Sequence, residues 1–351
     1  GDLIYGRRKF IEKAAIATTG AVVVGGAITA TAYHLQQQKS VKKTDSPAIS
    51  FRQSVEPHSP PEILEGSHKQ PSNEDPLPED RGDENTKNPD SKTAAEGYNL
   101  ENFAKNIEGI LKTSKGEWKI FIKEVSGNVL YEKNKDALLH PASSIKPLIA
   151  LLIFRHLQKN NILLNSKIDS TQQSFLEALT LMLVESNEEA TERLTKFLAT
   201  QYNLRDLVSS FGLKRTSIEP RQSTSFELGT ILDQSFIQKL ELRSDFITFY
   251  YSLLTEAAKR NTNRLSCLFE TTKNQQEFDI EIYKKPGTLL NPPLLVDTAI
   301  ITVISKKTKE RHFFVFCIHG TGNGANFVDL EKTTTSLAMQ FYSDILQHTF
   351  R

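Results

Sequence analysis

The chain has 351 residues, of which 24% are charged and 38% hydrophobic, and its formal net charge is +1. This composition is typical of a soluble globular protein with additional polar sequence. It argues against a nucleic acid as partner, because nucleic-acid binding needs a basic face or stripe. The two cysteines, Cys267 and Cys317, form no C-x-x-C pair, so neither a metal nor a cofactor is predicted. One disulfide is the alternative to two buried thiols, which the apolar run FFVFCI around Cys317 favours.

The N-terminal segment has the pattern of an export signal. The basic run RRKFIEK (residues 7–13) precedes an uncharged stretch that is rich in Ala, Gly, Thr and Val. An A-x-A pattern predicts cleavage after Ala32, and the paired arginines resemble a twin-arginine signal. The stretch is also about 20 residues long, enough to span a bilayer, so an uncleaved membrane anchor is the alternative. Either interpretation of residues 1–33 places the rest of the chain outside the cytoplasm, in the periplasm or the extracellular space.

A polar segment follows over residues 34–97. It holds most of the chain's 14 prolines and a single aromatic residue, Phe51. Such a composition cannot bury enough apolar surface to offset the entropy of ordering the chain. We therefore predict a disordered linker without chemistry of its own, followed by one folded domain over residues 98–351.

The folded domain begins with a helix, a hairpin and a block of helices. Apolar residues recur at helical spacing from Leu100 to Leu111. The runs WKIFIKEV and VLYEK flank the turn at residues 126–128 and predict a β-hairpin. The segments FLEALTLMLVESNEEATERLTKFLATQY and LRDLVSSFG continue as helices.

The domain ends with strands and one more helix. VDTAIITVIS and HFFVFCIHG are apolar, β-branched runs separated by the charged turn KKTKER, and LEKTTTSLAMQFYSDILQHTF is helical again. Strands from both ends of the domain are expected to form one antiparallel sheet that the terminal helices cover. The middle block would form a separate helical lobe, which makes the predicted fold class α+β.

The segment HPASSIKPLIALLIFRHL (residues 140–157) places polar groups at the head of an apolar helix. Ser143 and Lys146 lie one helical turn apart and share a face. A partly desolvated lysine can lose its proton and act as a base for a serine nucleophile. Pro147 requires the helix to begin at or very near Ser143, because only the first turn tolerates a missing N–H. The alternative is a serine cap before a core helix.

Three segments resemble the motifs of the serine β-lactamase and penicillin-binding protein superfamily, closest to class A β-lactamases. Pro141-Ala142-Ser143-x-x-Lys146 resembles the nucleophile motif. In FLEALTLMLVESNEEATERL, Ser186 falls on the serine of the second motif, which is S-D-N in the family. In IYKKPGTLLNPPLLVDTAIITV, Lys285 and Gly287 match the third motif, K-T-G on a strand. The resemblance implies a sheet flanked by terminal helices, plus a mostly helical lobe.

The resemblance also implies roles for these residues. Ser143 would attack a carbonyl carbon to form an acyl-enzyme, while Lys146 takes or relays its proton. Ser186 would pass a proton to the leaving nitrogen, and Lys285 would help to hold a substrate carboxylate. The backbone N–H groups of Ser143 and Thr288 would form the oxyanion hole. The implied substrate is a β-lactam or a D-Ala-D-Ala type peptide of the cell wall, and we expect a monomer.

The chain departs from the family pattern at three positions that matter. Glu188 replaces the motif asparagine, and its negative charge should keep Lys146 protonated and make it a poorer base. Pro286 replaces the motif threonine and removes a hydroxyl. Glu219, in the sequence I-E-P, faintly resembles the family's deacylating glutamate, but its loop is short and a surface carboxylate is the favoured interpretation.

These departures leave two hypotheses. The first is an exported serine hydrolase of β-lactamase or penicillin-binding type, with Glu188, Gly287 and Thr288 lining the substrate site. The second is a catalytically degenerate domain that binds a cell-wall peptide or a protein. A salt bridge from Glu188 to Lys146 or Lys285 that also blocks the cleft would favour the second hypothesis.

Overall fold

The computed structural model describes residues 99–349 except residues 171, 274 and 323. The expected export segment (residues 1–33) and linker (residues 34–97) lie outside the described residues. No helix of the described ranges is long and apolar enough to cross a membrane.

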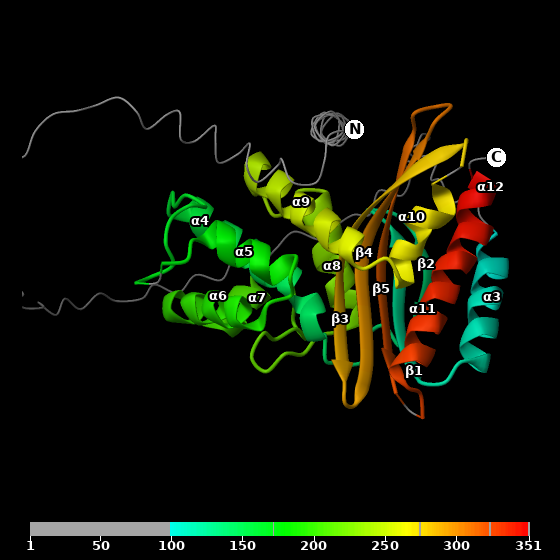
Figure 1. Cartoon of the computed structure of the whole chain (residues 1–351), viewed down its shortest axis with the longest axis horizontal. Coiled ribbons are helices and arrows are strands. Elements are labelled where there is room, and N and C mark those ends of the chain that lie inside the picture. Colours follow the sequence, from blue (N-terminus) through cyan, green and yellow to red (C-terminus); the bar gives the residue numbers. More distant parts are fainter. Residues whose placement is uncertain (1–98, 171, 274, 323, 350–351) are drawn as a thin grey trace, which may run out of the picture. The chain divides into compact units, whose positions relative to one another are not determined.

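A five-stranded antiparallel sheet forms the centre of the domain (Figure 1). The strand order is β2-β1-β5-β4-β3, which joins strands from both ends of the domain as predicted. The strands are β1 (Glu117–Glu124), β2 (Val129–Lys133), β3 (Phe278–Leu290), β4 (Pro293–Ser305) and β5 (Arg311–Thr321). The α+β fold class is therefore confirmed.

Helices from the two ends of the domain cover one face of this sheet. Figure 1 shows α3 (Leu100–Thr113) and α11 (Phe327–Phe341) side by side against it. The Phe341 ring lies between them and the sheet, with ring centroids 6.4 Å from Phe103 and 4.8 Å from Phe316. Strand residues alternate between the two faces, so the alternate residues Phe314, Phe316 and Ile318 of β5 join this core.

The opposite face carries the helical lobe, which is packed around one apolar helix. α4 (Lys146–Lys159) is buried along almost its whole length, as expected for a helix that is apolar on all sides. Around it lie α5 (Phe175–Leu183), α6 (Glu188–Gln201), α7 (Leu204–Ser209), α8 (Ser225–Phe236) and α9 (Ser244–Arg260). The predicted helical lobe is thus present.

The sequence analysis assigned no elements between residues 225 and 272. This stretch forms α8, α9, the 3₁₀ turn η3 (Arg264–Ser266) and the short α10 (Cys267–Thr272). The domain ends with a π-helical turn, η4 (Tyr342–Leu346), and α12 (Gln347–Thr349). Both cysteines are free thiols; Cys317 is fully buried and Cys267 is half-buried.

Substitution of Phe154 tests the packing of the helical lobe. Its side chain is fully buried, and its ring stacks on that of Phe246 with 5.3 Å between the centroids. Phe154→Ala should lower the free energy of unfolding of the full chain by about 3–5 kcal/mol, since it leaves a cavity. Urea denaturation followed by circular dichroism measures this loss. Leu163→Ala, at a side chain that is 67% exposed, is the control and should change it by less than about 0.5 kcal/mol. Equal effects of the two substitutions would contradict this packing.

Candidate active site

The start of α4 presents the predicted nucleophile. A 3₁₀ turn, η2 (Ala142–Ile145), leads directly into α4, and Pro147 is the second residue of that helix. The prediction that the helix begins at or very near Ser143 is therefore confirmed. Ser143 is half-buried, whereas its neighbour Ser144 is buried. Ala142 adopts a φ of +48°, an unusual backbone conformation that often marks functional sites.

The turn between α5 and α6 brings the Ser186 hydroxyl into contact with the Ser143 hydroxyl. Ser186 Oγ donates a hydrogen bond to Ser143 Oγ at 2.8 Å. Ser186 itself has a φ of +57°, immediately before the residue that caps α6. That cap is Asn187, whose side chain accepts a hydrogen bond from the N–H of Ala190 at 2.8 Å. The turn thus fixes the direction of the Ser186 side chain.

Lys146 is fully buried and faces the same turn. Its Nζ donates to the Ser186 carbonyl oxygen at 2.8 Å, to Ser186 Oγ at 3.2 Å and to Glu188 Oε1 at 2.6 Å. No hydrogen bond joins Lys146 to Ser143 in the part of the chain that the structure describes. Burial lowers the pKa of Lys146, and the Glu188 carboxylate opposes this shift. We expected from the sequence that the charge of Glu188 favours the protonated form of Lys146, and the two side chains are in direct contact.

Arg221, which the sequence analysis missed, holds the other oxygen of the same carboxylate. Arg221 Nη2 donates to Glu188 Oε2 at 2.6 Å. Burial raises the pKa of Glu188, but the hydrogen bonds from Arg221 and Lys146 outweigh burial and lower the pKa to about 2. Glu188 is therefore ionised at neutral pH, and its two oxygens accept hydrogen bonds from Lys146 and Arg221.

A tight turn brings Arg221 to this position. Ser217 and Gln222 exchange backbone hydrogen bonds of 2.8 and 3.0 Å, and Ser223 pairs with Leu139 just before the nucleophile turn. Glu219 lies in the same turn but is exposed. Its carboxylate makes no hydrogen bond or ion pair with the described site residues. This placement does not support the deacylation role considered for Glu219.

Lys285 approaches the Ser186 hydroxyl from β3. Its Nζ donates to Ser186 Oγ at 2.9 Å and to the Pro286 carbonyl oxygen at 3.3 Å. Burial, followed by the charge of Lys146, lowers the pKa of Lys285 to about 7. Ser144 Oγ donates to the Lys285 carbonyl oxygen at 3.0 Å and so fastens the nucleophile turn to this strand.

Gly287 allows β3 to approach the nucleophile turn closely. A Cβ atom at this position would lie 2.8 Å from the Pro141 carbonyl oxygen and 3.1 Å from the Ser143 nitrogen. Glycine is therefore required by contact rather than by backbone conformation. The strand places Gly287 beside the Ser143 amide, one of the two groups expected to form the oxyanion hole.

Arg264 is a second cation that the sequence analysis missed. Its Nη2 donates to Thr288 Oγ1 at 3.1 Å, and its Nε lies 3.4 Å from Glu331 Oε1. The residue is buried, and Nη1 has no hydrogen-bond partner among the described residues. It has no recognisable motif around it, so only the fold reveals that it borders the site.

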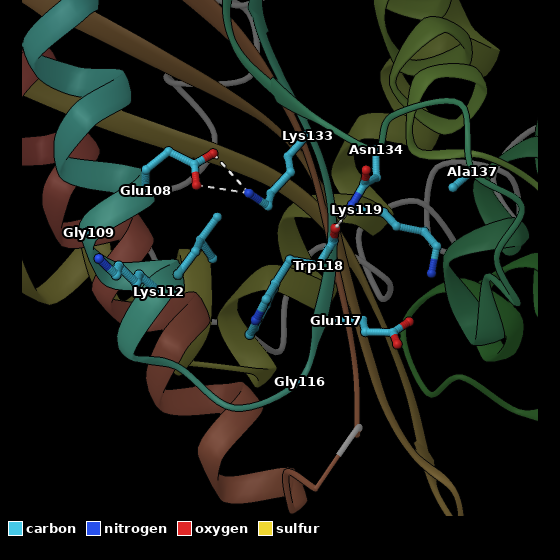
Figure 2. A pocket seen from close by; sticks show the side chains of 11 residues that line it. Glu108, Gly109, Lys112, Gly116, Glu117, Trp118, Lys119, Lys133, Asn134 and Ala137 are labelled. Carbon is cyan, nitrogen blue, oxygen red and sulfur yellow. Dashed lines mark hydrogen bonds and ion pairs between the residues drawn. The ribbon is translucent and has the colours of Figure 1, made fainter.

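A hollow of about 710 Å³ beside α3 and β1 contains none of these residues (Figure 2). Charged side chains of both signs line it. The Glu108 carboxylate accepts hydrogen bonds from Lys133 Nζ at 2.8 and 3.0 Å, which the dashed lines of Figure 2 mark. The residues that line the hollow include no nucleophile beside a base, so Ser143 and its neighbours form the candidate active site.

Comparison with known proteins assigns a family and a fold. A model described as "Beta-lactamase enzyme family" matches residues 102–317. The crystal structure of the TLA-1 extended-spectrum β-lactamase is similar with a TM-score of 0.58 at 16% identity, covering 70% of this chain and 99% of that one. A class A β-lactamase from Bacteroides cellulosilyticus gives a TM-score of 0.56 at 15% identity, covering 73% and 100%. A β-lactamase from Xanthomonas campestris pv. campestris gives 0.58 at 12%, covering 70% and 98%. No curated protein sequence matches the chain.

Gly287→Ala tests the close approach of β3 to the nucleophile turn. Its Cβ would push against the backbone on either side of Ser143, and such overpacking typically costs 1–3 kcal/mol. The free energy of unfolding of the full chain, measured by urea denaturation, should therefore fall by about 1–3 kcal/mol. Gly109→Ala is the control, because nothing lies within 4 Å of a Cβ there. A free energy of unfolding that does not fall in Gly287→Ala would contradict the close approach of the strand to the turn.

Proposed function

The chain belongs to the beta-lactamase enzyme family, and we propose that it is an exported serine hydrolase that forms an acyl-enzyme through Ser143. The substrates would be β-lactams or D-Ala-D-Ala type peptides. The observation that carries the proposal is the 2.8 Å hydrogen bond between the hydroxyls of Ser143 and Ser186, beside two buried lysines. Nucleophile, proton carrier and cations are the parts that acyl transfer needs.

The proposed reaction begins with attack of Ser143 Oγ on a carbonyl carbon. The proton of Ser143 leaves through the Ser186 hydroxyl, which lies in hydrogen-bonding contact with it. The backbone N–H groups of Ser143 and Thr288 would stabilise the oxyanion, and losing one such donor typically costs about 2.7–4 kcal/mol. When the C–N bond breaks, the Ser186 hydroxyl gives a proton to the leaving nitrogen.

The positive charge of the site suits a substrate that carries a carboxylate. Arg264 donates a hydrogen bond to Thr288, three residues beyond Lys285 on β3, and its Nη1 has no hydrogen-bond partner among the described residues. The Arg264 guanidinium is buried, and a buried cation interacts more strongly with an anion than a cation in water does. Gly287 and Thr288 would form the edge along which the substrate lies.

Long-lived acylation is part of the proposal. The exposed Glu219 has no contact with the site residues through which it could activate a water molecule. An acyl-enzyme from a β-lactam would then hydrolyse slowly. In this respect the protein would behave more like a penicillin-binding protein than like an efficient β-lactamase.

A non-catalytic binding domain is the second candidate, and one observation favours it. Glu188 forms the salt bridge with Lys146 that would weaken this lysine as a base. However, Ser143 is half-buried rather than covered, and the Glu188 side chain is 54% exposed and turned towards Arg221. The salt bridge therefore does not block the nucleophile, and we favour the enzyme.

Export and domain organisation complete the proposal. Residues 1–33 would direct or anchor the chain, residues 34–97 would act as a tether, and the domain from residue 98 onward would work as a monomer. The supporting observations are the basic and uncharged N-terminal pattern and the proline-rich composition that follows it. This location would bring the domain to cell-wall peptides.

Intact-mass spectrometry of the full chain after incubation with a fluorescent penicillin tests the function. We expect a stable adduct on Ser143 that is absent from Ser143→Ala. Ser336→Ala, at an exposed serine of α11, is the matched control and should still form an adduct. An adduct that persists for hours would indicate the slow deacylation proposed above. No adduct in a folded protein would instead support the binding domain.

A further inference from the structure

We propose that Lys285, acting through Ser186, is the base that receives the Ser143 proton during acylation, while Glu188 and Arg221 keep Lys146 as a fixed cation. The inference rests on the proposed function and reverses the roles that the family resemblance assigns to the two lysines.

A continuous chain of hydrogen-bonding atoms leads from the nucleophile to Lys285. Ser143 Oγ and Ser186 Oγ are 2.8 Å apart, and Ser186 Oγ and Lys285 Nζ are 2.9 Å apart. Hydroxyl groups can donate in either direction, so the same contacts carry a proton from Ser143 to a neutral Lys285. Lys146 Nζ lies farther from the shared hydroxyl, at 3.2 Å, and has no contact with Ser143 in the described ranges.

The two lysines differ in the groups that stabilise their positive charge. Lys146 has a carboxylate oxygen at 2.6 Å and a carbonyl oxygen at 2.8 Å, both of which stabilise an ammonium group. Lys285 is also buried, but no carboxylate lies within hydrogen-bonding distance of its Nζ among the described residues. A buried charge without a counter-ion is costly, so Lys285 gives up its proton more readily.

The charges around Lys285 agree with this assignment. Burial has the largest effect, and Lys146 on α4 also lowers the pKa; Lys284 on β3 lowers it by a smaller amount. Glu188 on α6 and Asp297 on β4 oppose them, and the resulting pKa is about 7. Below this pH the ammonium form prevails and cannot accept a proton, so acylation should accelerate as the pH rises through 7 and then level off.

Arg221 is a positioning residue in this scheme. It occupies one oxygen of Glu188 and leaves the other for Lys146. The arrangement fixes the carboxylate beside Lys146 and keeps it away from Lys285, which therefore lacks a direct counter-ion.

The proton balance closes without any further reactant. As Ser143 Oγ bonds to the carbonyl carbon, its proton moves to Ser186 Oγ and the Ser186 proton moves to Lys285 Nζ. The carbonyl π electrons form the oxyanion. When the C–N bond breaks, its electron pair stays on nitrogen, Ser186 protonates that nitrogen, and Lys285 returns a proton to Ser186. The oxyanion electrons re-form the carbonyl group, and the net result is an ester on Ser143 and a neutral amine, with Lys285 neutral again.

The test compares acylation rates of the full chain with a fluorescent penicillin from pH 5 to pH 10. In the wild type we expect the rate to rise about tenfold per pH unit below a midpoint near 7. Lys285→Arg keeps the charge but not the base, because arginine stays protonated; its rate should fall roughly 10²- to 10⁴-fold. Lys146→Arg should lose much less. Lys159→Arg, at the exposed end of α4, is the surface control.

Two outcomes would overturn the inference. One is a wild-type profile that is flat or has its midpoint above pH 9, which requires no variant and so does not depend on how a variant folds. The other is a folded Lys285→Arg protein that acylates as fast as the wild type while Lys146→Arg is inactive. Failure of the wild type to acylate at all would contradict the proposed function, and this result is distinct from both.

Discussion

Two lysine side chains are buried beside one serine hydroxyl. The arrangement of the rest of the site depends on the electrostatic free energy of burying two ammonium groups so close together. Lys146 and Lys285 place their Nζ atoms 3.2 and 2.9 Å from Ser186 Oγ. Two neighbouring ammonium groups in a dry environment repel each other and lose hydration, so both cannot remain charged without compensation. Glu188 forms an ion pair with Lys146, whereas no carboxylate among the described residues forms one with Lys285. We therefore expect Lys146 to stay protonated and Lys285 to lose its proton more readily.

The fold supplies the geometry that this pair requires. The nucleophile turn is fastened to β3 by the Ser144 hydrogen bond, and Gly287 lets the strand come close enough for Lys285 to reach across. Unusual positive φ angles at Ala142 and Ser186 lie on the two sides of the shared hydroxyl contact. Such conformations persist only where surrounding structure determines them, and they cluster at functional sites. Here the supporting structure is the apolar helix α4 on one side and the central sheet on the other.

Short-range periodicity predicted the strands and the terminal helices, whereas the motif residues were identified by their resemblance to the motifs of the family. The same reasoning found Glu188 and its effect on Lys146. It missed Arg221 and Arg264, since neither lies in a motif and each reaches the site only through a long-range contact: Arg221 is 33 residues from Glu188, and Arg264 is 24 residues from Thr288. It also assigned the proton-accepting role by resemblance to Lys146. The structure favours Lys285 as the proton acceptor, because Lys285 is buried and the Glu188 carboxylate faces Lys146 instead. No sequence pattern encodes either feature.

The most direct test of this account is an NMR titration of the lysine side chains in the full chain. The protein is labelled with ¹³C and ¹⁵N on lysine, and the Lys146→Arg and Lys285→Arg variants assign the two signals. The account predicts that Lys285 loses its proton near pH 7 and that Lys146 is still protonated at that pH. If Lys146 loses its proton first, or if Lys285 stays protonated beyond pH 9, the division of roles between the two lysines is wrong.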